Sequence, residues 1–342
     1  MSGTDGGEAT RRRTAAPPCV VVTHDPTPEV RGAYRRELGA RCELLFLPDL
    51  APADRNAALA RASALIAWNP RIEIGAADVH AMTSLGFVQL MTAGVDHVPL
   101  HLFPRDVPIA SNAGVFAGPM AEFALAMTLA AAKRLPVEHR EMRDGRFNQF
   151  AVNRTLDGAV CAILGFGGVG RAAAWLFGAL GAEIYAINRS GKTDEKVAFI
   201  GTLAALRTAL DAADVVLVSL SLTGATAGLI GARELGWMKD DAILVNVARG
   251  EIVDQDALYR HLVDNGRFFA CLESWWIEPV RHGEFRIEHP FLDLPNVIAA
   301  PHNSASVPGA HLDAVRSGAR NVRRWLDGEA PRNLLGADER GA

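Results

Sequence analysis

A short run of glycines is the most chemically informative feature of this sequence. Gly165, Gly167 and Gly170 follow the pattern G-x-G-x-x-G, directly after the apolar run 159–164 and before the helix-forming segment 171–177. In a strand–turn–helix setting, this spacing binds the pyrophosphate of a dinucleotide. The first glycine permits the tight turn, the second lets the pyrophosphate approach, and the third lets helix and strand pack closely. Free N–H groups at the helix start favour an anion. An ordinary strand–helix turn is the alternative. The predicted cofactor-binding residues of the turn are Gly165, Gly167, Gly168, Val169 and Gly170.

The end of the next strand bears on which dinucleotide binds. In such a motif an acidic residue about 20 positions on accepts the ribose hydroxyls of NAD. Here the strand 183–187 is followed by Asn188, Arg189 and Ser190, with no Asp or Glu among them. A guanidinium can pair with a 2′-phosphate, and a hydroxyl can donate a hydrogen bond to it. We therefore predict that Asn188, Arg189 and Ser190 bind the cofactor, that NADP is favoured and that NAD is possible. The alternative is that Arg189 stacks on the adenine and both cofactors are accepted.

The elements that position these residues alternate between strand and helix. Such alternation predicts α/β units with parallel, doubly wound sheets, which bind ligands beyond the carboxyl ends of their strands. A long helix over 116–134 and a charged, irregular connection over 138–154 join the two series of strands. A helix over 310–326 has nothing of its own to pack on and is expected to return to the first series. The first series has strands at 19–23, 42–47, 64–67, 87–91 and 107–111. The second has six, at 159–164, 183–187, 215–219, 243–247, 268–272 and 297–300.

Length and composition are those of an ordinary globular protein. The 342 residues favour two domains, and the apolar fraction of 49% is enough to give each a core. A net charge of −4 gives no reason to expect nucleic acid or an anionic membrane as partner, and no apolar run reaches membrane-spanning length. The four cysteines are far apart, which indicates reduced thiols in the cytoplasm and neither a disulfide framework nor a metal site. Residues 1–18 are polar and lack the apolar core of a signal peptide, so we predict a disordered leader.

Three further segments, in order, carry a family resemblance. After the glycine turn come Asn246 to Asp254 with Arg249 inside, then Glu278–Pro279, then Pro301–His302. This order and spacing resembles the D-isomer-specific 2-hydroxyacid dehydrogenases, including glyoxylate and hydroxypyruvate reductases, from about Cys19 to the C-terminal helix. The resemblance implies a Rossmann domain inserted in a flavodoxin-like substrate domain, with the active site between them. The implied domains are 19–112 plus 303–342 for substrate and 113–302 for NAD(P).

The resemblance also implies that Arg249, Glu278 and His302 are catalytic. Reducing a 2-keto acid requires a hydride to the carbonyl carbon, a proton to its oxygen and an anchor for the carboxylate. Arginine offers a planar, charged fork for the carboxylate and the carbonyl. Histidine titrates near neutrality and can give or take the proton, and a carboxylate beside it favours imidazolium and orients the ring.

Other positions are predicted to contact the ligands. The family's loop after the fourth strand donates backbone N–H groups to the substrate carboxylate, and Asn69 could contact substrate or serve only as a turn residue before proline. Glu273 stands where the family usually has an aspartate that contacts the nicotinamide amide, and the alternative is a surface acid at the end of the strand. The substrate-binding candidates are Ala93, Gly94, Val95 and Asn69. The further cofactor-binding candidates are Ser219 on the adenine side, and Val247, Ala248 and Glu273 beside the nicotinamide.

These expectations combine into one function with two alternatives. We expect a cytoplasmic, homodimeric oxidoreductase that uses NAD(P) and acts on a small 2-keto or 2-hydroxy acid, glyoxylate or hydroxypyruvate being favoured. The main alternative is a dinucleotide-sensing, corepressor-like binding protein of the same fold, which could keep the same three residues. Formate oxidation is the third possibility, but it would be expected to have glutamine where Glu278 stands.

Overall fold

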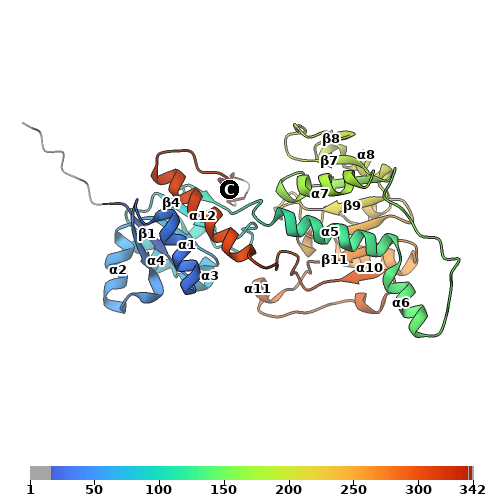
Figure 1. Cartoon of the computed structure of the whole chain (residues 1–342), viewed down its shortest axis with the longest axis horizontal. Coiled ribbons are helices and arrows are strands. Elements are labelled where there is room, and N and C mark those ends of the chain that lie inside the picture. Colours follow the sequence, from blue (N-terminus) through green and yellow to red (C-terminus); the bar gives the residue numbers. More distant parts are fainter. Residues whose placement is uncertain (1–16, 338, 341–342) are drawn as a thin grey trace, which may run out of the picture.

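Two parallel sheets organise the chain, one in each of two units that lie side by side (Figure 1). A computed structural model describes residues 17–337, 339 and 340. The predicted leader therefore lies, up to residue 16, outside the described residues. Among the helices of the described part, none is long and apolar enough to cross a membrane.

The first unit, here called the five-stranded unit, has the strand order β2-β1-β3-β4-β5, which is that of flavodoxin-like folds. The C-terminal helix α12 (Ala310–Leu326) packs against α1 (Pro28–Leu38) and β4 of this unit. Its strands are β1 (Cys19–Val22), β2 (Glu43–Phe46), β3 (Ala62–Ala67), β4 (Phe87–Leu90) and β5 (Ile109–Ala110). Its other helices are α2 (Pro52–Ala60), α3 (Pro70–Glu73) and α4 (Ala76–Ala81).

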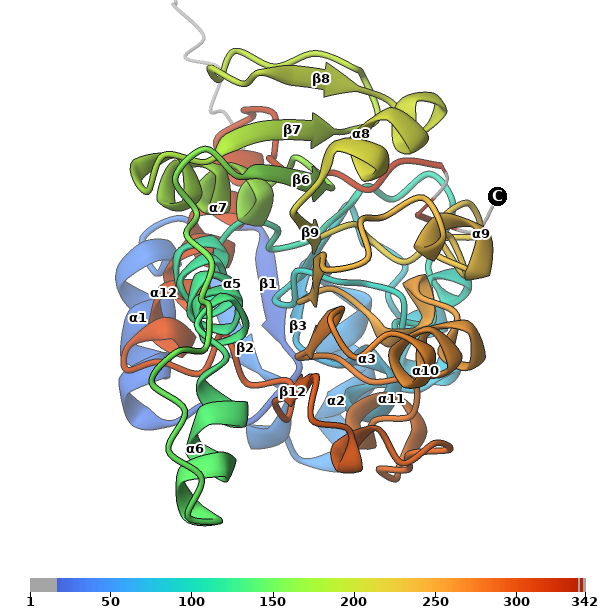
Figure 2. The same ribbon diagram turned by 90° about the vertical axis from the view of Figure 1, so that its right-hand side faces the viewer.

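The second unit, the seven-stranded unit, has the order β12-β11-β10-β9-β6-β7-β8, a Rossmann sheet with one added strand. Figure 2 shows α5 and α7 together on one face, while α8, α9 and α10 pack on the other. The strands are β6 (Val160–Leu164), β7 (Glu183–Ile187), β8 (Phe199–Gly201), β9 (Val215–Val218), β10 (Ile243–Asn246), β11 (Phe269–Leu272) and β12 (Val297–Ala299). The helices are α5 (Ala117–Ala132), α6 (Leu135–Arg143), α7 (Gly168–Ala179), α8 (Leu206–Ala212), α9 (Ala232–Leu235), α10 (Gln255–Asp264) and α11 (Pro279–His282).

The apolar runs in the sequence are explained by burial on both faces of each sheet. In β9, Val215 and Leu217 pack under α5 and α7, whereas Val216 and Val218 join the cluster under α8 and α10. Strands covered on both faces have no polar side to alternate with. This confirms the predicted fold class of two doubly wound, all-parallel sheets.

Two local predictions were wrong. The segment from residue 138 was expected to be irregular, but α6 extends over Leu135–Arg143, with Pro136 in its first turn and acidic Glu138 near its start. The helical periodicity of this segment was not recognised because most of its residues are charged or polar. The second series was expected to have six strands, but β8 adds a seventh at the sheet edge. A strand of three residues that ends in glycine is too short to be recognised from its sequence pattern.

Candidate active site

The glycine turn has the close contacts and the open space that its residue types predict. Gly165 has φ +101°, and a Cβ there would lie 2.6 Å from backbone atoms of Ser219. A Cβ on Gly170 would lie 2.3 Å from the carbonyl oxygen of Gly165. At Gly167, just before α7 begins, a Cβ would meet nothing within 4 Å. The turn therefore has room for a pyrophosphate at the helix start and none where strand and helix pack.

The residues predicted beside the cofactor differ in what their side chains do. The Ser219 hydroxyl donates to the carbonyl of Gly165 at 2.8 Å, so it supports the turn. Val247 is fully buried in the core, and Ala248 is nearly so, which leaves their backbone as the surface they can offer. The Ala248 carbonyl accepts a hydrogen bond from Arg249 at 2.8 Å.

The loop after β7 is folded by Asn188. Its amide donates to the carbonyl of Lys192 at 2.8 Å and accepts from the N–H of Gly191 at 2.7 Å. Arg189 is exposed and makes no ion pair within the described part of the chain. Asn188 thus holds the loop in shape. The guanidinium of Arg189 and the hydroxyl of Ser190 are the groups that the loop exposes for a ligand.

The structure brings His302 and Glu278 into direct contact. Nδ1 of His302 lies 2.8 and 2.9 Å from the two carboxylate oxygens, although 24 residues separate them in sequence. His302 has φ +52°, a left-handed conformation that is uncommon for residues other than glycine and concentrates at functional sites. Two further hydrogen bonds hold this geometry. The N–H of His302 donates to the carbonyl of Glu273 at 2.9 Å, and the N–H of Trp275 donates to Glu278 at 2.7 Å.

Glu273 is fully buried beside this pair. One carboxylate oxygen accepts from the N–H of Ser304 at 2.8 Å, which fixes the segment that follows His302. The other oxygen is buried and has no partner among the described residues. The predicted role at the nicotinamide amide therefore rests on this second oxygen alone.

The electrostatics of the pair favour imidazolium beside carboxylate. Burial opposes charge on Glu278, but the hydrogen bond and charge of His302 hold the pKa of Glu278 below its usual value. Burial also disfavours charge on His302. The hydrogen bond that His302 donates to Glu278 and the nearby charges of Glu273 and Glu278 outweigh burial and the repulsion of Arg249, and raise the pKa of His302. His302 thus stays protonated to a higher pH than a free histidine.

Arg249 reaches from the end of β10 to the five-stranded unit. Its Nε lies 3.1 Å from Oδ1 of Asp96, and a Cβ on Gly94 would lie 2.1 Å from its Nη2. Only glycine at position 94 allows this approach. The N–H groups of Ala93, Gly94 and Val95 donate to no acceptor within the residues that the structure describes, so the loop has free donors beside the guanidinium.

Asn69 behaves as a turn residue. It precedes α3, its N–H donates to Glu73 at 2.8 Å, and its carbonyl accepts from the N–H groups of Ile72 and Glu73. Its side-chain oxygen is buried without a partner in the described structure. No contact in the structure places it beside Arg249 or His302.

Three residues of the site were not predicted. Asp96 lies in the same turn as Gly94, and Arg281 follows Glu278 by three positions. The roles of Asp96 and Arg281 can be seen only in the folded structure, where the two units contact each other. The amide of Asn246 donates to the carbonyl of Arg249 at 2.8 Å and accepts from the N–H of Ala248 at 3.0 Å. Its place in the segment with Arg249 was the available signal.

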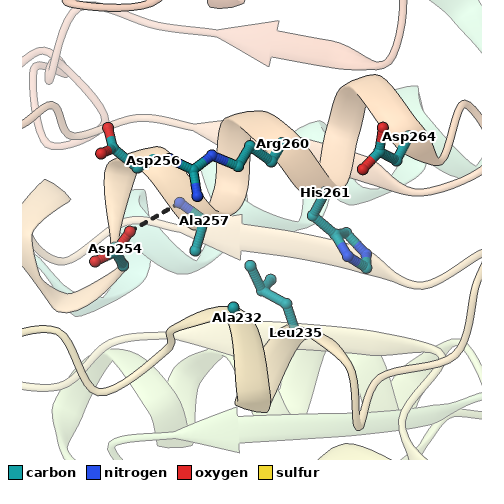
Figure 3. A pocket seen from close by; sticks show the side chains of 8 residues that line it. All are labelled: Ala232, Leu235, Asp254, Asp256, Ala257, Arg260, His261 and Asp264. Carbon is teal, nitrogen blue, oxygen red and sulfur yellow. Dashed lines mark hydrogen bonds between the residues drawn. The ribbon is translucent and has the colours of Figure 1, made fainter.

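A surface hollow elsewhere on the seven-stranded unit contains none of these residues (Figure 3). It lies between α9 and α10. The side chain of Asp254, the N-cap residue of α10, accepts a hydrogen bond from the N–H of Ala257 at 2.8 Å. The residues that line it are Ala232, Leu235, Asp254, Asp256, Ala257, Arg260, His261 and Asp264.

The carboxyl ends of neighbouring parallel strands therefore gather a dinucleotide turn after β6, an arginine after β10 and an acid–base pair after β11 and β12. That arrangement defines a nicotinamide-dependent dehydrogenase. The family model described as "D-isomer specific 2-hydroxyacid dehydrogenase, NAD binding domain" matches residues 125–304. The chain belongs to this family.

Known proteins resemble this chain in both sequence and fold. A glyoxylate reductase of Aeropyrum pernix is 30% identical over 260 residues, 73% of this chain and 76% of the relative. A glyoxylate reductase/hydroxypyruvate reductase of Mus musculus is 26% identical over 323 residues, 85% of this chain and 97% of that one. A D-isomer-specific 2-hydroxyacid dehydrogenase of Xanthobacter autotrophicus Py2, solved with NADPH and MES, matches with a TM-score of 0.78 and 25% identity. The match covers 96% of this chain and all of that one.

The raised pKa of His302 gives a first prediction. With His302 as the proton donor for reduction, kcat/KM for the keto acid is expected to be constant below that pKa and to fall as pH rises through it. In Glu278→Gln the carboxylate charge that raises this pKa is gone. The alkaline limb of the pH–rate profile should therefore move to lower pH. Asp256→Asn, at the His289–Asp256 pair at 2.7 Å, is the control and should leave the limb unmoved. An unchanged limb in Glu278→Gln would assign it to another group.

Proposed function

We propose that the protein reduces a small 2-keto acid to the D-2-hydroxy acid, with glyoxylate or hydroxypyruvate as substrate. The observation that carries this proposal is the pairing of His302 with Glu278 beside an Arg249 guanidinium that packs against Gly94. The names of the relatives from Aeropyrum pernix and Mus musculus support the choice of substrates.

In the proposed mechanism each residue has one task. Arg249 binds the substrate carboxylate and polarises the carbonyl, with the free N–H groups at Ala93 to Val95 as further donors. His302 gives its proton to the carbonyl oxygen as charge develops there, and Glu278 keeps the ring protonated and oriented. The bound nicotinamide supplies the hydride. In the oxidative direction His302 takes the proton back.

We further propose that Gly165, Gly167, Gly168, Val169, Gly170, Ser219, Val247, Ala248 and Glu273 hold the dinucleotide. The domains are proposed as 19–112 plus 303–342 for substrate and 113–302 for cofactor. Four buried, unpaired thiols at Cys19, Cys42, Cys161 and Cys271 support a reducing compartment, the cytoplasm.

The direct test is a reductase assay of the purified chain with a panel of 2-keto acids and both reduced cofactors. We expect turnover with glyoxylate or hydroxypyruvate above that with keto acids bearing large apolar groups. A corepressor-like binding protein would bind the dinucleotide and show negligible turnover with every acid. That result would replace the proposed function with the alternative.

A second prediction concerns the cofactor. Because Arg189 and Ser190 are presented where NAD enzymes carry an acid, we propose that NADP(H) is preferred. Wild-type kcat/KM should be at least about tenfold higher with NADPH than with NADH, the worth of a charge-assisted hydrogen bond. Arg189→Ala should remove most of this preference while leaving the hydrogen bonds of Asn188 intact. Asn188→Asp with Arg189→Ala should reverse it.

A wild type that favours NADH, or variants whose ratio does not change, would show that Arg189 does not read the 2′-phosphate. Lys196→Ala, a change of charge beyond this loop, is the control and should leave the ratio unchanged.

We also propose a homodimer through the seven-stranded unit. Large apolar side chains are exposed on α6, the segment after it and α7, and extended exposed apolar surface marks interaction sites. They are Leu135, Met142, Phe147, Phe150, Val152 and Trp175, exposed by 56%, 55%, 73%, 83%, 87% and 74%.

Sedimentation should therefore give a mass twice that of the 36.6 kDa chain. Phe150→Glu with Trp175→Glu should shift the protein toward monomer, because a charge would have to be buried at the interface. Ile72→Glu, at an equally exposed position on the other unit, is the control and should leave the dimer intact. A monomeric wild type would contradict the proposal.

A further inference from the structure

Arg281 is a largely buried cation that bridges the two units. It lies on α11, and its side chain is only 15% exposed. Its Nε is 2.9 Å from Oδ2 of Asp96 on the five-stranded unit, and its Nη1 is 2.5 Å from Glu251 on its own unit. A charge removed from water needs such partners. The side chain therefore has a carboxylate on each side of the boundary, and its Nη1 contact with Glu251 is an ion pair without hydrogen-bond geometry.

Asp96 divides its carboxylate between two guanidiniums. Oδ1 lies 3.1 Å from both Nε and Nη2 of Arg249. Oδ2 lies 2.9 Å from Nε of Arg281 and 3.3 Å from Nε of Arg249. The Asp96 side chain is 10% exposed. Asp96 therefore faces Arg249 with both oxygens, and Arg281 pairs with one of them, Oδ2.

The contacts of Arg249 leave donors for a substrate. A guanidinium has five N–H donors. Asp96 and the Ala248 carbonyl engage Nε, Nη2 and Nη1, which uses at most three of them. At least two N–H groups remain, enough for a bidentate carboxylate. Asp96 thus orients the guanidinium without occupying all of it.

Arg281 adds a positive charge to the ion-pair cluster around Arg249. Arg249 and Arg281 face two carboxylates, those of Asp96 and Glu251. Without Arg281, the carboxylates of buried Asp96 and half-buried Glu251 would stand near the guanidinium that is proposed to receive an anionic substrate. Like charge in a partly desolvated site disfavours anion binding.

From these contacts we propose that Arg281 is a positioning residue of the dehydrogenase: it locks Asp96 onto Arg249 across the boundary and cancels the negative charge that would repel the substrate carboxylate. A further cross-boundary contact holds α11 in place, since Arg71 of α3 donates to the Arg281 carbonyl at 2.9 Å. The inference rests on the proposed role of Arg249 as substrate anchor.

The test is Arg281→Gln, which keeps hydrogen-bonding capacity and removes the charge. The KM for the keto acid should rise by about tenfold or more, as expected when one partner of a buried charge pair is lost. The Kd for NADPH should stay within about twofold, because Arg281 makes no contact with the glycine turn or the 188–190 loop. Arg281→Lys should recover part of the KM. Arg207→Gln, at an exposed ion pair with Asp211, is the matched control.

Two double variants separate positioning from a merely structural role. In an Asp96→Asn background, Arg281→Gln should add little further loss, since its effect passes through Asp96. Glu251→Gln combined with Arg281→Gln should recover substrate affinity by restoring the charge balance, which a structural defect would not do. Thermal unfolding of each variant checks that it is folded.

Two results would overturn the inference: an unchanged KM in Arg281→Gln, or a loss that is additive with Asp96→Asn and is not relieved by Glu251→Gln. Both results can be obtained only if the wild-type protein turns over a keto acid. A wild type without turnover on any keto acid would instead reject the proposed function.

Discussion

Replacing His302 with alanine is expected to lower kcat for keto-acid reduction by about 10²–10⁴-fold, the usual contribution of a positioned acid–base group. The structure gives the reason: His302 is the histidine paired with buried Glu278, and that pairing raises its pKa. Dinucleotide affinity should change little, because His302 does not contact the glycine turn. Steady-state kinetics together with NADPH binding, measured by fluorescence, check both parts of this prediction.

The matched control is His289→Ala. His289 also pairs with a carboxylate, Asp256 at 2.7 Å, but its ring packs on Tyr259 and Phe291 instead of facing Glu278. Its loss should leave kcat nearly unchanged. Turnover close to wild type in His302→Ala would remove His302 from the mechanism and leave the pairing with Glu278 as a structural feature.

The second large effect is expected at Arg249, the proposed substrate anchor. Arg249→Lys keeps the charge but loses the planar fork, which binds a carboxylate in bidentate fashion. The KM for the keto acid should rise and kcat should fall, because both the carboxylate and the polarised carbonyl are affected. Together kcat/KM should drop by roughly 10- to 100-fold, the worth of one or two charge-assisted hydrogen bonds.

An exposed arginine provides the comparison. Arg316→Lys changes the same residue type at a surface ion pair with Asp313 and should leave both constants unaltered. Unchanged kinetics in Arg249→Lys would mean that another cation binds the substrate carboxylate. Arg281, the other guanidinium that contacts Asp96, would then be the first candidate.

Much of this protein could be predicted from local sequence. The glycine turn was recognisable because its constraints are local: Gly165 needs a positive φ, and Gly170 must admit the neighbouring backbone within a few residues. The strands were recognisable because both faces of each sheet are covered, which leaves unbroken apolar runs such as Val215–Val218. His302 and Glu278 were predicted only through the order and spacing of family-like segments, since neither residue is unusual in its local sequence.

The rest depended on contacts between residues far apart in the chain. Asp96 and Arg249 are separated by 153 positions, and no local pattern indicates that one carboxylate joins two guanidiniums from the other unit. Gly94 was predicted only as part of a loop that donates backbone N–H groups, whereas the tertiary structure shows that Arg249 occupies the space in which its side chain would lie. The left-handed His302 and the buried Glu273 that accepts from Ser304 were likewise decided by packing. Sequence determined the elements and the reactive residue types, whereas the meeting of the two units decided their geometry, because buried charges must find partners wherever the fold brings them.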